Sequence, residues 1–166
     1  MYDRMLVAVD GSPTSASGLG EAIRIAALTG AKVRLVHVLD AWSYTNGFET
    51  PVVYCEEVVP FMRKEGSRIL DEARKRVLQA GLEVSSLLIE KVTQRVAELV
   101  VAQASDWGAD LIVIGSHGRR GLDRAMMGSD AEQIVRLASV PVLVVKEAEE
   151  AIRKRGQGLS PLLASC

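Results

Sequence analysis

The alternation of short apolar runs with helical patterns constrains the fold of this chain most strongly. Five apolar runs occur, at residues 5–9, 33–38, 82–89, 111–114 and 142–145. The stretches between them carry apolar residues at helical spacing, and glycines or prolines separate the two kinds of segment. Strands that alternate with helices predict an α/β domain with a single, mostly parallel sheet.

The connections between these segments predict how the sheet is ordered. Right-handed crossovers with one reversal give a doubly wound five-stranded sheet of order 3-2-1-4-5, with helices on both faces, as in Rossmann-like or flavodoxin-like folds. The first and fourth strands are then neighbours, and a crevice opens beyond their carboxyl ends. Asp10 ends the first strand and Gly115 follows the fourth. We therefore expect these two residues to face one cleft.

Capping residues predict where the helices begin and end. Ser12 followed by Pro13 is a favourable helix start, because the serine side chain can cap the first turn and proline lacks an N–H that would go unpaired. Gly30, Gly81 and Gly108 each follow a helical pattern and are expected to end it.

Composition limits the class of protein and its partners. A length of 166 residues fits one domain, expected at residues 1–146, with a tail at 147–166. The net charge of −1 gives no field for nucleic acid or for an anionic membrane. No apolar run is long enough to insert in a membrane, and neither spacing nor number of the two cysteines suggests disulfides. A cytoplasmic protein is expected.

A glycine-punctuated loop, residues 115–130, joins the fourth strand to the last helix with the sequence GSHGRRGLDRAMMGSD. Gly115, Gly118 and Gly128 let the backbone approach a ligand closely, and the N-terminus of the following helix favours an anion. The chain has neither a GxxxxGK[ST] motif nor GxGxxG after its first strand. The loop therefore predicts a different kind of phosphate cradle.

Other side chains of this loop have predicted roles as well. Arg119 could add bidentate phosphate contacts or simply be exposed to solvent. Ser129 and Glu132 have the spacing of a capping box at the start of the helix. Met126 and Met127 are expected to pack beneath the loop as adaptable apolar residues.

These motifs resemble those of a known family. The spacing of Gly115, Gly118, Gly128 and Ser129 is similar to the nucleotide motif of universal stress proteins, specifically their ATP-binding branch. The resemblance extends through VAVDGS, VHV, ADLIVIGSHGRRG and SVPVLVVK, and so covers residues from about 2 to 146. It implies that Asp10 contacts the ribose, that the Val38 backbone reads the adenine edge, that Ala8 lines the pocket and that the loop holds the phosphates.

The candidate nucleotide-binding residues are therefore Ala8, Asp10, Val38, Ile114, Gly115, His117, Gly118, Arg119, Gly128, Ser129, Asp130 and Ala131. The expected ligand is ATP or another adenine nucleotide, with Mg²⁺ as a candidate companion ion. No catalytic residue and no protein metal site are expected, and the two histidines, His37 and His117, are interpreted as structural and loop-shaping. Asp130 departs from the family pattern, in which this position is usually small or apolar. A carboxylate beside a triphosphate repels it by about 1 kcal/mol or more.

Three functions fit the sequence. The first is a regulatory module in which nucleotide binding is coupled to dimer or partner interactions. The second is a slow ATPase or adenylate-transferring enzyme, and the third is a nucleotide-free dimeric interaction protein. The family resemblance implies a homodimer through the last strand, Val142–Val145, and the aromatic-rich residues 40–55 form either a packed loop or a lid.

Overall fold

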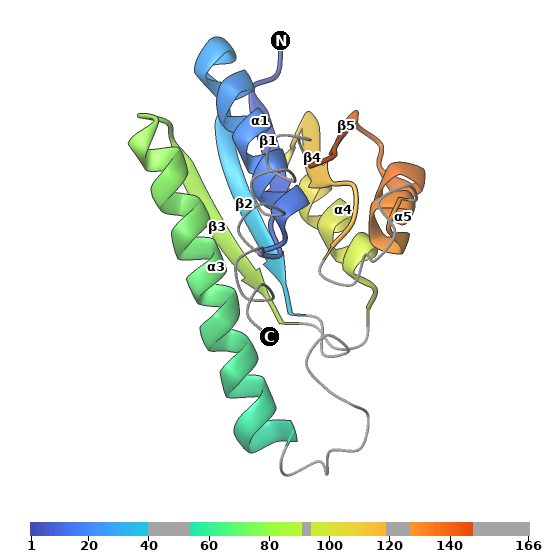
Figure 1. Ribbon diagram of the computed structural model, residues 1–166. Helices are drawn as coiled ribbons and strands as arrows, with labels where there is room; N and C mark the ends of the chain where they lie inside the picture. The colour runs from blue at the N-terminus through green and yellow to red at the C-terminus, as the bar shows by residue number, and fades with distance from the viewer. Residues whose placement is uncertain (40–53, 91–93, 119–126, 148–166) are drawn as a thin grey trace, which may run out of the picture.

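The protein folds as an α/β domain built on five strands, seen in a computed structural model that describes residues 1–39, 54–90, 94–118 and 127–147 (Figure 1). In chain order the elements are β1 (Arg4–Ala8), α1 (Pro13–Thr29), β2 (Lys32–Val38), the π-helical turn η2 (Tyr54–Val58), α3 (Val59–Gln79), β3 (Val84–Ile89), α4 (Val96–Trp107), β4 (Leu111–Gly115), α5 (Ser129–Leu137) and β5 (Val142–Val145).

The five strands form one sheet of order β3-β2-β1-β4-β5, and every neighbouring pair runs parallel. The predicted order is confirmed, and β1 and β4 are neighbours. Strands β3 and β5 are the two edges of the sheet. The carboxyl ends of β1 and β4 thus meet at one end of the sheet.

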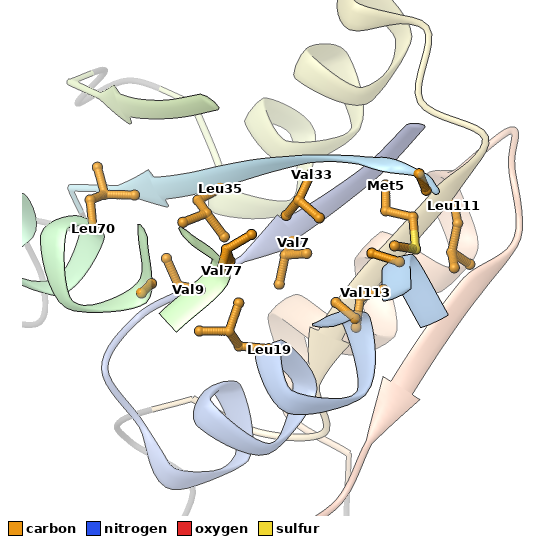
Figure 2. Packing of buried hydrophobic residues seen from close by; sticks show 14 of the residues in the cluster. Met5, Val7, Val9, Leu19, Val33, Leu35, Leu70, Val77, Leu111 and Val113 are labelled. Atoms are coloured by element: carbon orange, nitrogen blue, oxygen red, sulfur yellow. The ribbon is translucent and has the colours of Figure 1, made fainter. Parts of the chain in front are cut away.

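Helices cover both faces of the sheet. Helices α1 and α3 lie on one face and α4 and α5 on the other, with a separate apolar core on each side (Figure 1). Figure 2 shows the first core, where Leu19 of α1 and Val77 of α3 lie over strand residues such as Val7 and Leu35. Leu6 belongs to the opposite core. Because successive side chains of a strand alternate between faces, strands buried on both faces are continuously apolar.

The helix boundaries follow the predicted signals at three places. The Ser12 hydroxyl accepts a hydrogen bond from the Ser15 N–H at 3.2 Å, and Pro13 is the first residue of α1. Gly30 and Gly108 end α1 and α4 in the left-handed conformation, with φ of 74° and 67°. Such backbone angles favour glycine because it has no Cβ.

Two predictions around the last helix are wrong. The N-cap of α5 is Gly128, whose carbonyl accepts the Glu132 N–H at 2.9 Å, so Ser129 is already helical and forms no capping box. The Glu132 carboxylate instead lies 3.6 Å from Arg136 one turn along. Met127 is 45% exposed and does not pack beneath the loop, while Met126 lies outside the described residues.

Several predicted features fall where the structure gives no description. These are most of the aromatic-rich segment, Arg119 and its neighbours up to residue 126, and the tail from residue 148. Among the helices that are described, none is both long and apolar enough to span a membrane.

Candidate functional site

A pocket of about 280 Å³ opens at the carboxyl ends of β1 and β4. Eleven of the twelve candidate residues line it, namely Ala8, Asp10, Val38, Ile114, Gly115, His117, Gly118, Gly128, Ser129, Asp130 and Ala131. The twelfth, Arg119, lies outside the described residues. Segments more than 100 residues apart in the sequence therefore meet at one pocket, as the crevice at a topological switch point requires.

The remaining residues that line the pocket were not predicted to do so from the sequence. Four are aliphatic residues from β2, α4 and α5: Val36, Val96, Val100 and Ile134. Val96 and Val100 are four residues apart on α4, so their spacing predicts that they share one face of the helix. The spacing does not predict that this face lines the pocket. The others are Val9, Ser12, Ser15 and His37.

Asp10 is held in place by the start of α1. One carboxylate oxygen, Oδ1, accepts the Ser12 N–H at 2.8 Å, and the Asp10 N–H donates to the Ser15 hydroxyl at 3.2 Å. The second oxygen, Oδ2, faces the glycine loop, since a Cβ added at Gly118 would lie only 2.7 Å from it. The carboxylate is thus fixed on the pocket wall with one oxygen directed to the opposite segment.

The glycines of the loop are required by space. A Cβ at Gly115 would lie 2.7 Å from the Thr14 hydroxyl oxygen and 2.8 Å from the Ser15 backbone nitrogen. A Cβ at Gly128 would lie 3.2 Å from the His117 Cα. The backbone of this loop therefore packs directly on α1 and on itself, leaving main-chain groups on the pocket surface.

The backbone of Val38 faces the pocket because β2 is longer than β1. The Leu39 N–H donates to the Ile89 carbonyl of β3 at 2.9 Å. Main-chain groups of successive residues alternate between the two sides of a strand, so those of Val38 point to the β1 side. There β1 ends at Ala8, and Val9 N–H makes a 2.9 Å bond to the Val36 carbonyl. The Val38 amide and carbonyl consequently face the space beyond the end of β1.

The two histidines have different surroundings. His37 is buried, and its Nδ1 lies 2.6 Å from the Val9 carbonyl oxygen. His117 lines the pocket, and its Nδ1 lies 2.9 Å from the Ser116 hydroxyl. Among the described residues, no three His, Cys, Asp or Glu side chains gather in a way that would hold a metal ion.

The pocket combines three kinds of surface. An aliphatic wall suits a flat apolar group, a fixed carboxylate suits hydroxyl donors, and main-chain amides near the N-terminus of α5 suit an anion. The arrangement is therefore suited to binding.

Comparison with known proteins agrees with this arrangement. Residues 1–146 match the Universal stress protein family. The universal stress protein YxiE of Bacillus subtilis is 31% identical over 88% of this chain and 100% of its own length. A crystal structure of a family protein from Burkholderia pseudomallei is 34% identical, with a TM-score of 0.69, over 89% of this chain and 97% of that one.

A further structure carries a ligand. It is the universal stress protein from Archaeoglobus fulgidus in complex with dAMP, which is 26% identical to this chain with a TM-score of 0.62. The similarity covers 87% of this chain and 98% of that one.

Proposed function

This chain belongs to the universal stress protein family, and from that premise we propose that it is a regulatory module that binds ATP or a related adenine nucleotide. The proposed site is the pocket between the ends of β1 and β4. The spacing of Gly115, Gly118, Gly128 and Ser129 supports membership of the ATP-binding branch of the family. The dAMP complex of the relative from Archaeoglobus fulgidus supports an adenine nucleotide as the ligand.

The base would occupy the part of the pocket nearest β2 and α4. There the aliphatic side chains of Val36, Val96 and Val100 offer a wall for a flat ring. The Val38 main chain presents one donor and one acceptor to the same space, which matches the donor and acceptor on the exposed edge of adenine. Adenine could therefore be recognised without any charged side chain.

The ribose and phosphates would lie toward β4. Asp10 is an acceptor held in a fixed orientation, which suits the ribose hydroxyl groups as donors. The backbone of Gly115 and Gly118 and the first turn of α5 surround the adjoining space, where the helix dipole favours negative charge. Convergence of these groups, from both ends of the chain, is the observation that carries the proposal.

Asp130 bears on how many phosphates the site holds. It lies in the first turn of α5, is exposed and lines the pocket. Its negative charge opposes a phosphate chain at that end by about 1 kcal/mol, an effect reduced by solvent and by a bound Mg²⁺. We infer that ATP is bound with its terminal phosphates toward solvent and that Mg²⁺ accompanies it.

We further propose that nucleotide binding is coupled to dimer or partner interactions through β5. This edge strand consists of four apolar residues, Val142–Val145, all of them half-buried. An apolar strand at a sheet edge is suited to pairing with a second chain. Because β5 pairs with β4, which leads directly into the glycine loop, a change at the pocket has a short structural path to this edge.

The proposal is tested by asking what the protein carries and binds. Mass spectrometry of the supernatant after denaturing protein purified without added ligand should reveal an adenine nucleotide. Calorimetric titration of stripped protein with ATP, ADP, AMP and cyclic AMP should then give saturable binding. Gly128→Asp should abolish it, because the new carboxylate would lie at the phosphate end. If wild-type protein neither carries nor binds an adenine nucleotide, the proposal is wrong.

A further inference from the structure

Thr14 connects the start of α1 to the glycine loop from behind the pocket. It is the second residue of α1, is 1% exposed, and is not among the residues that line the pocket. Its hydroxyl donates a hydrogen bond to the main-chain carbonyl of His117. A side chain that no ligand can touch therefore holds the backbone of the loop.

The hydrogen bonds around Thr14 have a defined direction. The Ser15 N–H donates to the Ser12 hydroxyl oxygen at 3.2 Å, and the Ser12 and Thr14 hydroxyl oxygens lie 3.2 Å apart. The single Thr14 proton is directed to His117, so the Ser12 hydroxyl must be the donor to Thr14. A continuous chain of donors thus runs from the first turn of α1 to the His117 carbonyl.

The same network of hydrogen bonds includes Asp10, the residue proposed to bind ribose. The Ser12 N–H donates to the Asp10 carboxylate at 2.8 Å. The Ser12 residue therefore holds Asp10 through its backbone and Thr14 through its side chain. The two halves of the pocket, one from β1 and one from β4, are joined by these hydrogen bonds.

Fixing the His117 carbonyl also fixes the next amide. In a trans peptide unit the carbonyl and the following N–H point in opposite directions, and the unit is planar and rigid. A His117 carbonyl that points to Thr14 therefore directs the Gly118 N–H away from α1. Because Gly118 lines the pocket, an N–H that points away from α1 can face the pocket.

We propose that Thr14 is a positioning residue that orients the Gly118 amide toward the phosphates of the bound nucleotide. This inference rests on the proposed function, because it assigns phosphate recognition to one amide of that site. It makes a specific distinction between ligands. Loss of the Thr14 hydroxyl should weaken the binding of the phosphate groups and leave binding of the base and ribose unchanged.

The experiment compares variants of Thr14 with a matched hydroxyl elsewhere on the same helix. Thr14→Val removes the hydroxyl at nearly constant shape, and Thr14→Ser retains it. The control is Thr29→Val, because the Thr29 hydroxyl also donates to a main-chain carbonyl, that of Ile25, but at the far end of α1. Calorimetry with adenosine, AMP and ATP measures each affinity, and thermal unfolding shows that each variant is folded.

The expected result is a loss confined to phosphate-bearing ligands. Thr14→Val should lower the affinities for AMP and ATP by about threefold to tenfold, which corresponds to the loss of one hydrogen bond. The affinity of Thr14→Val for adenosine should equal that of wild type. Both Thr14→Ser and Thr29→Val should bind all three ligands with wild-type affinity. If Thr14→Val does not fold, Thr14→Ala compared with Thr14→Ser makes the same distinction.

Three results would overturn the inference. Equal weakening of adenosine and AMP in Thr14→Val would show a general disturbance of the pocket. Unchanged AMP affinity would show that the hydroxyl has no part in phosphate binding. A wild type that binds none of the three ligands would overturn the proposed function as well, and this distinguishes the two failures.

Discussion

Gly118→Ala is a minimal change that tests how the two halves of the pocket fit together. The new Cβ would lie 2.7 Å from Oδ2 of Asp10, whereas real Cβ atoms essentially never approach a neighbour closer than 3.0 Å. Gly118 is exposed, and its φ lies outside the left-handed range where a side chain would strain the backbone. The substitution should therefore act through this one contact and not through backbone strain.

The size of the effect follows from how Asp10 is held. To make room for the methyl group, the Asp10 carboxylate must rotate or the loop must move back. Rotation breaks the 2.8 Å hydrogen bond from the Ser12 N–H, and a hydrogen bond to a charged group contributes about 1.5–3 kcal/mol. Because the same carboxylate is proposed to bind ribose, the affinity for ATP should fall roughly 10-fold to 100-fold.

Calorimetric titration with ATP measures this loss, and two comparisons identify its cause. Gly20→Ala is the matched control, since its Cβ would make an ordinary 3.7 Å contact with the Arg76 guanidinium, and ATP affinity should not change. In an Asp10→Ala background, Gly118→Ala should lower the affinity for ATP much less than it does in wild type, because the clashing carboxylate is gone. Wild-type ATP affinity in the single Gly118→Ala variant would refute this reasoning.

Three further predictions concern stability, turnover and assembly. Gly66→Ala should lower the unfolding free energy by about 1–3 kcal/mol in chemical denaturation, because its Cβ would lie 2.8 Å from the buried His37 ring; unchanged stability would show that α3 can move away. Phosphate release from ATP should stay at background in wild type and in Asp10→Ala; turnover that disappears in the variant would instead favour an enzyme. Val144→Lys should convert the proposed dimer to a monomer in light scattering, and an unaltered dimer would exclude β5 as the interface.

Much of the fold was predictable because the central strands are buried on both faces. Continuous apolar runs such as Leu111–Gly115 have few alternatives to a central parallel strand, and glycines such as Gly30 and Gly108 end helices for a local steric reason. Local signals of this kind do not depend on distant parts of the chain. Strand order then followed from the handedness of the crossovers, which is a general property of L-amino acids.

The details of the site were less predictable because they depend on contacts between distant segments. No sequence motif marks the apolar wall from α4 as part of the pocket. The role of the Thr14 hydroxyl becomes visible only when α1 and the glycine loop are placed together. Two residues in the same loop were also misjudged. Met127 is a large apolar residue, yet its side chain is 45% exposed.

The wrong prediction of a capping box at Ser129 changes how the phosphate end of the pocket is understood. A serine at the N-cap would place its own oxygen on the amides of the first helical turn, where a phosphate would otherwise bind. Gly128 occupies the cap instead, in an extended conformation with φ of −67° and ψ of 151°, and contributes no side-chain acceptor. Its own N–H donates to the Ser116 carbonyl at 2.8 Å, which ties the cap to the end of β4. The helix thus begins with a rigid cap that has no competing oxygen, and this favours an external anion at the start of α5.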